Sequence, residues 1–207
     1  MTIALISDIH GNLAALEAVL EHIAAQDVEA TYCLGDVVGY GAEPSACLKL
    51  VREHCDIRLM GNHEYQVLGL VDDDCLSPVA LKSSEWTKHQ LSETELAEIA
   101  DYAMDARVGD MYLVHASPYQ PEQWHYVVSD DEAARAFKSF EERICFYGHS
   151  HLPMIFSTSE DGVRQQVGHS FEPAEEKRYL VNVGSVGQPR DNDSRACYVT
   201  CDADSGD

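Results

Sequence analysis

Five short apolar runs in this chain each end at side chains that can bind a metal ion. The residues after these runs are aspartates, histidines and one asparagine, which offer oxygen and imidazole ligands to divalent cations. In chain order they are Asp8, His10, Asp36, Asn62, His63, His115, His149 and His151. No Cys-x-x-Cys pair occurs, so a thiolate zinc site is not expected. The ligand types favour manganese, iron, zinc, cobalt or nickel over calcium or magnesium.

These apolar runs have the length and composition of buried β-strands. They span residues 3–6, 32–34, 57–60, 111–114 and 144–147. In α/β folds, ligands bind at the carboxyl ends of parallel strands, so we expect the metal-binding side chains to meet in one crevice. Glycines precede Asp36, Asn62 and His149, where we expect them to let the backbone turn sharply.

Helices are predicted to connect the first three strands. Asn12 can cap a helix whose apolar stripe begins at Leu13, and Pro44 can begin a second helix. A strand-helix-strand order implies parallel crossovers. From about residue 65 to residue 107 helical patterns replace the strands, including a capping box at residues 92–95. We therefore predict a helical insertion at about 65–107.

The second half of the chain is rich in strands. The predicted strands span residues 111–115, 144–147, 154–158, 163–167, 178–183 and 196–201. A helix is predicted over residues 130–140, and Asp161-Gly162 is a hairpin signal that introduces antiparallel pairing. We predict an α/β (α+β) fold in which two packed sheets form a β-sandwich flanked by helices. At 207 residues, the chain is expected to form a single domain over residues 1–207.

The composition restricts the partners that we expect. Acidic residues outnumber basic ones by 36 to 14, and the net charge of −22 repels nucleic-acid backbones and anionic membranes. No apolar stretch approaches the roughly 18 residues of a membrane span. Seven scattered cysteines, an odd number, argue against a disulfide framework and favour a cytoplasmic location. Only 5 of the 14 basic residues are lysine, a balance that resembles that of halophilic proteins.

The order of the motifs is more specific than any one of them. Along the chain, the motifs are Asp-x-His at 8–10, Gly-Asp at 35–36, Gly-Asn-His-Glu at 61–64, a lone histidine at 115 and Gly-His-Ser-His at 148–151. This order resembles that of the calcineurin-like metallophosphoesterases, from Ile3 through Tyr198. The closing stretch, residues 182–190, is similar to that of the small bacterial and archaeal phosphoesterases. The resemblance implies the four-layer fold of that superfamily.

The resemblance also implies a dinuclear metal site with two divalent transition-metal ions. The implied ligands are Asp8, His10 and His151 for one ion, Asn62, His115 and His149 for the other, and Asp36 as the bridge between them. A carboxylate suits the bridge because its two oxygens can span metals roughly 3.5–4 Å apart. A hydroxide that bridges the ions, formed near pH 7, would attack phosphorus in line with the leaving oxygen. The implied function is hydrolysis of a small phosphodiester or phosphomonoester.

His63 is not a metal ligand in this assignment. The resemblance implies that it is the catalytic general acid beside the leaving oxygen, and the alternative is a hydrogen-bond donor that holds phosphate. Glu64 is expected to be structural. We predict substrate contacts for Tyr40, Trp124 and Arg190, and Tyr65, Tyr119 and Tyr126 are further aromatic residues near the crevice that we expect to select the substrate. The alternatives are that Trp124 fills a gap beneath the helical insertion and that Arg190 is a surface residue.

Two other functions compete with a hydrolase of small phosphoesters. Protein phosphatases of this superfamily carry an aspartate and an arginine in an extended second motif, whereas residues 35–41 read Gly-Asp-Val-Val-Gly-Tyr-Gly. Both residues are missing, which argues against a protein phosphatase and against a dinucleoside tetraphosphatase. The other competing function is that of a non-catalytic scaffold that binds proteins, like the retromer subunit of the same superfamily. All seven implied ligands and His63 are present here, which favours the hydrolase.

Overall fold

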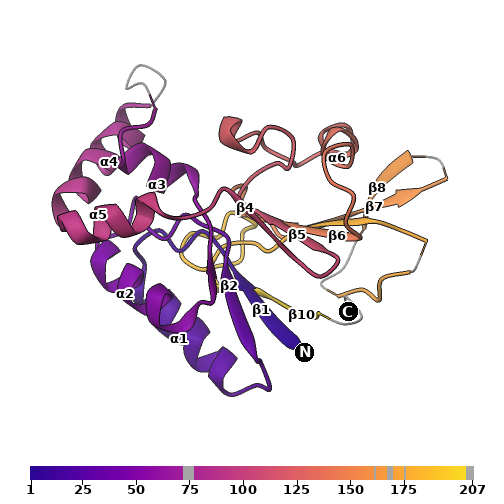
Figure 1. Cartoon of the computed structure of the whole chain (residues 1–207), viewed down its shortest axis with the longest axis horizontal. Helices are drawn as coiled ribbons and strands as arrows, with labels where there is room; N and C mark the ends of the chain where they lie inside the picture. Colours follow the sequence, from indigo (N-terminus) through magenta and orange to yellow (C-terminus); the bar gives the residue numbers. More distant parts are fainter. Residues whose placement is uncertain (72–76, 161, 167–169, 175, 204–207) are drawn as a thin grey trace.

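The computed structural model describes residues 1–71, 77–160, 162–166, 170–174 and 176–203. Within these ranges, two β-sheets pack face to face and helices cover their outer faces (Figure 1). The first sheet has the strand order β10-β1-β2-β3. Its strands are β1 (Thr2–Ile6), β2 (Ala30–Cys33), β3 (Ile57–Arg58) and β10 (Val199–Asp202). β1, β2 and β3 are parallel, and β10 pairs antiparallel to β1.

The second sheet has the strand order β4-β5-β6-β9-β7-β8. Its strands are β4 (Asp105–Val108), β5 (Met111–Val114), β6 (Ile144–Tyr147), β7 (Met154–Ser159), β8 (Gly162–Gln166) and β9 (Tyr179–Asn182). β5, β6 and β9 are parallel, and β4, β7 and β8 add antiparallel strands on either side. Each sheet therefore has a parallel part whose strands end at a common edge, where loops can gather ligands.

The helices mostly begin where the sequence predicts. They are α1 (Leu13–Ala24), α2 (Pro44–His54), α3 (Asn62–Val67), α4 (Pro78–Gln90), α5 (Glu93–Ala100), the 3₁₀ helix η2 (Pro121–Gln123) and α6 (Asp130–Ala136). The Asn12 side chain caps α1, and Ser92 forms the predicted capping box with Glu95 at α5. α1 to α5 gather beside the first sheet, whereas α6 lies beside the second (Figure 1). In the described part of the chain, no helix combines the length and apolar composition needed to cross a membrane.

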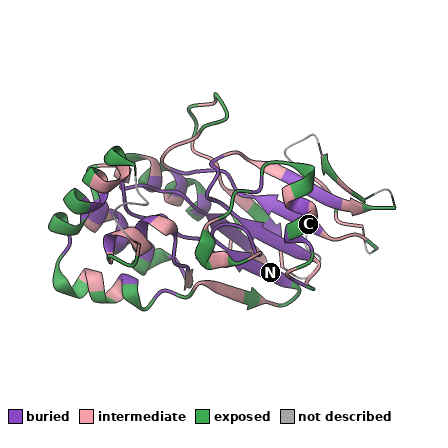
Figure 2. Ribbon diagram, turned by 90° about the horizontal axis from the view of Figure 1, so that it is seen from above, coloured by how far each residue is buried: buried purple, intermediate pink, exposed green. Residues whose placement is uncertain are grey.

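Alternating side chains divide the core into layers. In β1, Ile3 and Leu5 pack between the two sheets, whereas Ala4 joins the core beneath α1 and α2. In β6, Phe146 packs between the sheets and Tyr147 packs beneath α6. Both faces of these strands are apolar because both are covered. Figure 2 shows the buried strands between helices whose outer faces are exposed. The predicted α/β fold, with two sheets between helices, is confirmed.

One strand lies inside the range that we predicted to be helical. α5 ends at Ala100, and β4 then pairs with β5 through a two-residue turn at Gly109-Asp110. Gly109 has a φ of 57°, as a tight hairpin turn requires. The Gly-Asp pair is a hairpin signal in the sequence. It is easily overlooked because β4 is only partly buried and its apolar pattern is weak.

Several predicted boundaries also differ from the structure, three of them by more than one residue. The strand predicted at 57–60 is limited to β3, beyond which Leu59 forms a bridge with Ala103 and the N–H of Met60 donates to the Ala103 carbonyl. α6 ends before residue 140, and the guanidinium of Arg178 donates to the Phe137 carbonyl beyond it. The last strand begins at residue 199 rather than 196. These ends depend on contacts with residues far away in the sequence.

Candidate metal centre

Of the eight residues predicted from the sequence, six lie in loops directly after β1, β2, β5 and β6, and Asn62 and His63 form the start of α3, shortly after β3. All are buried except Asn62, which is partly exposed at the start of α3. Three groups of these side chains have ligand atoms within 4.8 Å of one another, namely Asp8, His10 and His151, then His10, Asp36 and His63, and finally Asp36, His115 and His149. The fold therefore brings together, at one place, side chains that are up to 143 positions apart.

Asp8, His10 and His151 form what we call the first half-site. Nε2 of His151 is 3.2 Å from Oδ1 of Asp8, and Nε2 of His10 is 3.8 Å from the same oxygen. The two Nε2 atoms are 3.1 Å apart, and the two rings stack with their centroids 4.8 Å apart. Three potential ligand atoms therefore converge.

Asp36, Asn62, His115 and His149 form the second half-site. Nε2 of His115 is 3.3 Å from Oδ2 of Asp36 and 3.1 Å from Oδ1 of Asn62. The ring of His149 lies 5.3 Å from that of His115. Oδ2 of Asp36 is also 3.8 Å from Nε2 of His10. The Asp36 carboxylate therefore faces both half-sites.

Backbone carbonyls orient three of the histidines. Nδ1 of His10 lies 3.2 Å from the carbonyl oxygen of Val38. Nδ1 of His115 lies 3.0 Å from that of Leu34, and Nδ1 of His151 lies 2.5 Å from that of Gln188. A carbonyl can only accept, so each Nδ1 carries the proton and donates it. In the neutral form of each ring, Nε2 then has a lone pair that faces the centre. Metal-binding histidines typically have this arrangement.

Two buried ligand atoms of the half-sites have no hydrogen-bond partner among the described residues. They are Oδ1 of Asp8 and Nε2 of His149. The other carboxylate oxygen, Oδ2 of Asp8, accepts a hydrogen bond of 3.0 Å from the backbone N–H of His149. A buried carboxylate oxygen without a donor is costly unless a cation binds it. The residues present therefore fit a divalent metal ion.

The electrostatics of the centre favour ionised carboxylates. Burial opposes the ionisation of Asp36, but the imidazoles of His115 and His63 outweigh it and hold the pKa of Asp36 well below its usual value. Burial lowers the pKa of His10 to about 3 and that of His149 to about 4, so both rings are neutral near pH 7. These are the protonation states that bind cations.

His115 differs from the other histidines. Burial opposes its protonation, but the carboxylate of Asp36 outweighs burial and raises the pKa of His115 to about 9. The ring is therefore protonated near pH 7 when no cation competes with the proton. Nε2 of His115 has to release its proton before it can bind a metal ion.

Backbone strain is concentrated at the centre. Nine described residues other than glycine have a positive φ, and five of them are the candidate ligands Asp8, His10, Asp36, His149 and His151. Such conformations cost about 1–3 kcal/mol each and persist only where the surroundings impose them. Hydrogen bonds between loops do so here, such as those from the N–H groups of Asp8 and His10 to the carbonyls of Gly35 and Asp36.

Glu64 ties two loops of the second half-site together. Its side chain is fully buried, and its two oxygens accept hydrogen bonds of 2.8–3.1 Å from the backbone N–H groups of Asp36, Val37, Val38 and Gly61. Burial, reinforced by the charge of Asp36, raises the pKa of Glu64 to about 7. These contacts agree with the structural role expected for this residue.

The glycines beside the ligands serve two purposes rather than the single one predicted. Gly35 has a φ of 112°, so it makes the expected turn before Asp36. Gly61 has a φ of −99°, which any residue can adopt. A Cβ atom at Gly61 would lie 2.2 Å from Oδ1 of Asp36, so this glycine permits close approach of two loops.

His63 lies beside both half-sites. Its backbone N–H donates a hydrogen bond of 2.8 Å to Oδ1 of Asp36, and its ring lies 4.8 Å from that of His10 and 4.4 Å from that of Tyr40. Its Nδ1 atom is buried and has no hydrogen-bond partner among the described residues. Burial lowers the pKa of His63 below its usual value. The position is compatible with both predicted roles, proton donor and phosphate-holding donor.

Tyr40 and Arg190, two of the predicted substrate residues, lie at the rim of the first half-site. The side chain of Tyr40 is 40% exposed, and its ring is 5.0 Å from that of His10. Arg190 is exposed and donates a hydrogen bond of 2.7 Å to the side chain of Gln188. Burial raises the pKa of Tyr40, and the neighbouring Arg190 partly offsets this. Both side chains can therefore be reached by a ligand.

The third predicted substrate residue, Trp124, lies beside the second half-site. Its ring is 5.4 Å from that of Tyr65 and 6.0 Å from that of His115, and it packs against the hydrophobic core. This packing fits the alternative that Trp124 fills a gap. Two residues later, Tyr126 is 50% exposed and stacks on His149, with centroids 4.3 Å apart and ring planes 26° apart.

Two residues that support the ligands had no role in our sequence-based prediction. Asn182 donates a hydrogen bond of 2.6 Å to the carbonyl of Gly148, next to His149. The hydroxyl of Ser185 donates one of 2.8 Å to the carbonyl of Asp8. Both residues belong to the closing stretch that supports the family resemblance. That stretch was the available signal for their role.

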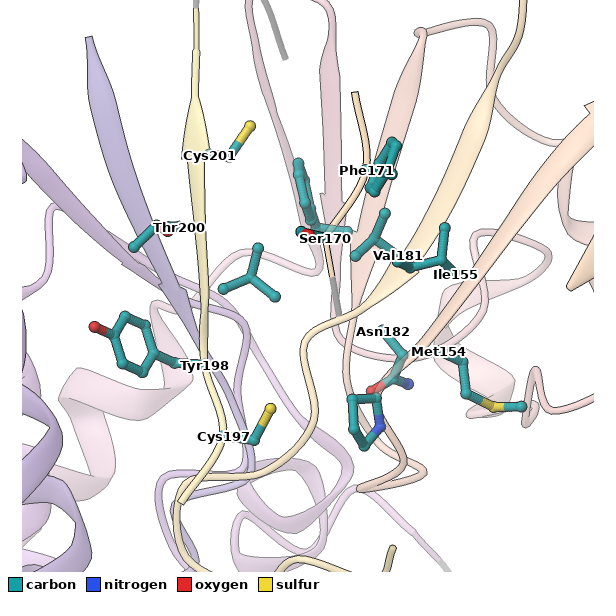
Figure 3. A pocket seen from close by; sticks show the side chains of 13 residues that line it. Met154, Ile155, Ser170, Phe171, Val181, Asn182, Cys197, Tyr198, Thr200 and Cys201 are labelled. Carbon is teal, nitrogen blue, oxygen red and sulfur yellow. The ribbon is translucent and has the colours of Figure 1, made fainter. Parts of the chain in front are cut away.

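An open cleft of about 370 Å³ lies beside the first half-site. Its lining consists of His10, Gly11, Asn12, Tyr40, Gly41, Ala42, Glu43, Gly187 and Gln188. A separate pocket of about 290 Å³ opens between the sheets, where Val181 and Ile155 face β10 (Figure 3). None of the candidate ligands is among the described residues that line this second pocket. The cleft therefore gives a ligand access to the first half-site.

Comparison with known proteins identifies a matching family. Residues 1–206 match the model of the calcineurin-like phosphoesterase superfamily domain. The uncharacterized protein MJ0912 of Methanocaldococcus jannaschii is 37% identical to this chain over 204 residues. The match covers 97% of this chain and 82% of that protein.

Solved structures share the fold. A metallophosphoesterase from Sphaerobacter thermophilus matches with a TM-score of 0.84 and 37% identity, covering 100% of this chain and 85% of that one. The hypothetical protein PH1004 from Pyrococcus horikoshii matches with a TM-score of 0.74 and 20% identity, with the same coverage of both chains. At this identity the second likeness concerns the fold alone.

Proposed function

This chain belongs to the calcineurin-like phosphoesterase superfamily, and we propose that it is a metal-dependent hydrolase of phosphoester bonds in small molecules. One observation carries the proposal. Oδ2 of Asp36 lies 3.8 Å from Nε2 of His10 in the first half-site and 3.3 Å from Nε2 of His115 in the second, and the first half-site lies beside an open cleft. In two-metal hydrolases the ions are about 3.5–4 Å apart, a distance that one carboxylate can span.

The two half-sites would each hold one divalent transition-metal ion, with Asp36 in contact with both. When bound, the ions would supply a water that ionises near pH 7 and positive charge for the phosphoryl oxygens. Asp8 and Asp36 contribute negative charge, and the carbonyl-bound histidines present Nε2. The nitrogen and oxygen donors suit manganese, iron, zinc, cobalt or nickel.

His63 would protonate the leaving oxygen of the substrate. Its support is positional, because the backbone hydrogen bond to Asp36 and the ring contacts with His10 and Tyr40 hold the imidazole beside both half-sites. Because burial lowers the pKa of His63, the acid role should be strongest on the acid side of neutral pH. A neutral ring can still donate a hydrogen bond to phosphate, which is the alternative role.

A non-catalytic scaffold is the competing function. Such a protein has no need for unpaired ligand atoms in its interior or for strained backbone at five ligand positions. The protein phosphatase and dinucleoside tetraphosphatase alternatives gain no support, because Tyr40 occupies the loop in which the missing residues would lie. A hydrolase of small phosphoesters is therefore favoured.

The surface charge and the cysteine pattern bear on the partners and the location of the protein. The net charge of −22 supports a small phosphoester as substrate rather than a nucleic-acid polymer, whose backbone the surface would repel. A cytoplasmic location stays a prediction from the cysteine pattern. It can be examined by fractionating cells that produce the protein.

The decisive experiment joins metal analysis to a substrate panel. The chelated protein is reconstituted in turn with manganese, iron, zinc, cobalt and nickel, and bound metal is counted by mass spectrometry. Each sample is then assayed against phosphodiesters, phosphomonoesters and nucleotides. We expect two ions per chain and hydrolysis of at least one class. Two ions without hydrolysis would favour the scaffold, and no more than one ion with every metal would contradict the dinuclear site.

A further inference from the structure

Two exposed aromatic rings lie on the candidate metal centre. Among the described residues, the large exposed hydrophobic side chains include three aromatic ones, namely Tyr40 at 40%, Trp86 at 42% and Tyr126 at 50%. Trp86 belongs to α4. The two tyrosines instead contact candidate histidine ligands. A single exposed aromatic residue needs no explanation, but two on one site indicate a binding surface.

The two tyrosines approach the centre from different half-sites. Tyr40 comes from the loop between β2 and α2, and its ring contacts His10 and His63. Tyr126 comes from the loop before α6 and stacks on His149. The two rings therefore lie beside different half-sites of one centre.

Both rings are anchored through their backbones. Tyr40 has a φ of 62°, and its N–H donates a hydrogen bond of 2.7 Å to the hydroxyl of Ser83 on α4. Val127, next to Tyr126, is 2% exposed, and its carbonyl accepts a hydrogen bond of 2.9 Å from the buried hydroxyl of Tyr147. Rigid aromatic rings bind a partner at a low cost in conformational entropy.

The cleft beside Tyr40 has room for a flat group. Its lining includes Gly11, Gly41 and Gly187, which present backbone instead of side chains. Gly187 has to stay a glycine, because a Cβ atom there would lie 1.8 Å from the carbonyl oxygen of Ile9. The volume of about 370 Å³ lies within the range of small-molecule sites. Backbone surfaces beside the rings of Tyr40 and His10 suit a planar ligand.

We propose that the substrate carries a planar aromatic ester group, either a nucleobase or a phenyl ring, and that Tyr40 and Tyr126 bind the faces of this group while the phosphate lies at the half-sites. The proposal rests on the proposed hydrolase function and names its substrate class. Stacking between a base and an aromatic side chain corresponds to about 5- to 150-fold in affinity. The acidic surface favours a small ester over a polymer.

The test compares esters whose leaving groups are all primary alcohols and that differ in the planar group. Adenosine 5′-phosphate is paired with ribose 5-phosphate, and benzyl phosphate is paired with cyclohexylmethyl phosphate, each as the monoester and as the methyl diester. Values of kcat and KM are measured for the metal-loaded wild type and for Tyr40→Leu, Tyr126→Leu, Tyr40→Phe and Tyr126→Phe, with bound metal counted in each. Tyr198→Leu, which changes a tyrosine bonded to His22, is the matched control.

We expect the wild type to have a higher kcat/KM for the planar member of at least one pair. The pair that shows this preference tells whether the planar group is a nucleobase or a phenyl ring. Each leucine variant should lose about 5- to 150-fold in kcat/KM for that member, mainly through KM, and lose clearly less for the non-planar member. Both phenylalanine variants and the control should keep the preference. Equal values within both pairs for the wild type, or equal losses on both members of a pair in the leucine variants, would overturn the inference.

Binding measurements separate this inference from the proposed function. Calorimetry of the chelated wild type and of Tyr126→Leu, with the same esters, needs no turnover. If the wild type hydrolyses no ester but binds the planar member more tightly, and Tyr126→Leu removes the difference, hydrolysis fails and the aromatic site stands. If hydrolysis occurs but binding shows no preference for the planar member, the aromatic site fails and the hydrolase stands.

Discussion

The two half-sites of the metal centre consist of similar residue types but hold their protons differently. In the first, burial lowers the pKa of His10 to about 3, so its Nε2 atom needs no deprotonation at neutral pH. In the second, Asp36 outweighs burial and raises the pKa of His115 to about 9. Oδ2 of Asp36 is 3.3 Å from His115 but 3.8 Å from His10. One half-site is ready for a cation, whereas the other has to exchange a proton for it.

The half-sites also differ in what holds them in place. The Asp8 loop is fixed by backbone hydrogen bonds and by the hydroxyl of Ser185. The carbonyls of the Asp36 loop accept those backbone bonds, but its N–H groups depend on one buried carboxylate, that of Glu64, which also binds the loop before Asn62. The second half-site is therefore the more vulnerable to a single substitution. Changes at the shared or supporting residues can test this difference.

The largest effect is expected from Asp36→Asn, which removes the charge that faces both half-sites. We expect loss of the second ion and a fall in activity of more than about 100-fold. The fold should persist, because asparagine keeps an oxygen that can accept the N–H of His63. Metal analysis, thermal melting and assays on the same samples measure this. Asp27→Asn, at an exposed aspartate, is the control. Two retained ions with near-full activity would show that Asp36 is not the shared ligand.

His63→Ala tests the histidine that lies between the half-sites. An alkoxide leaving group needs a proton, whereas nitrophenolate departs readily without one. We expect hydrolysis of alkyl esters to fall by about 10²–10⁴-fold and that of nitrophenyl esters to fall far less. His54→Ala, at an exposed histidine, is the control, and bound metal is counted in every sample. Equal losses on both leaving groups with both ions retained would leave His63 as a phosphate-holding residue.

Glu64→Gln should separate the two half-sites. An amide group cannot accept hydrogen bonds at both ends, so two buried N–H groups would lose their partner. We expect the free energy of unfolding to fall by about 2–5 kcal/mol, and the second ion to bind more weakly than the first. Urea unfolding and metal titration measure these effects, with the exposed Glu53→Gln as the control. Equal weakening of both ions would contradict the difference between the half-sites.

The pH dependence of metal binding tests the proton on His115. With a pKa of about 9, this ring is protonated below pH 9 and has to lose one proton when the second ion binds. The affinity for that ion should rise about tenfold per pH unit up to pH 9, and binding should release one proton. Calorimetry in two buffers of different ionisation enthalpy counts the protons. Release of no proton at pH 7.5 would contradict the raised pKa.

The raised pKa of His115 also makes the stability of the metal-free protein depend on pH. In protein stripped of metal, the folded pKa of His115 is raised above the unfolded value of 6.5. The stabilisation from its pairing with Asp36 is therefore fully present below pH 6.5 and is lost as the pH rises through about 9. Thermal melting of the chelated protein from pH 6 to pH 10 should follow this direction.

The smallest expected effect concerns the surface rather than the half-sites. Salt should raise the melting temperature, because it screens repulsion among 36 acidic side chains, whereas the buried pairs of the centre are screened much less. Melting across a series from low to molar sodium chloride measures the effect. A melting midpoint that stays level or falls with salt would contradict the interpretation of this composition as halophilic.

The sequence by itself determined the ligand types and their positions at strand ends. Strand periodicity and ligand chemistry are local properties, so the run at 144–147 predicts β6 without error and places His149 and His151 just beyond it. Local signals were also sufficient for the caps at Asn12 and Ser92. β4 was missed, although its turn at Gly109-Asp110 is a local signal, because its partly buried strand has no clear apolar pattern.

Only the tertiary structure decided the proton states, the unpaired ligand atoms and the aromatic rim. Oδ1 of Asp8 meets His151 from the far end of the chain, and Glu64 meets the loop of Asp36. Tyr126 stacks on His149 because two loops of the second sheet converge. A pKa depends on burial and on the distance to other charges in space. Those distances join residues far apart in sequence, so no local pattern contains them.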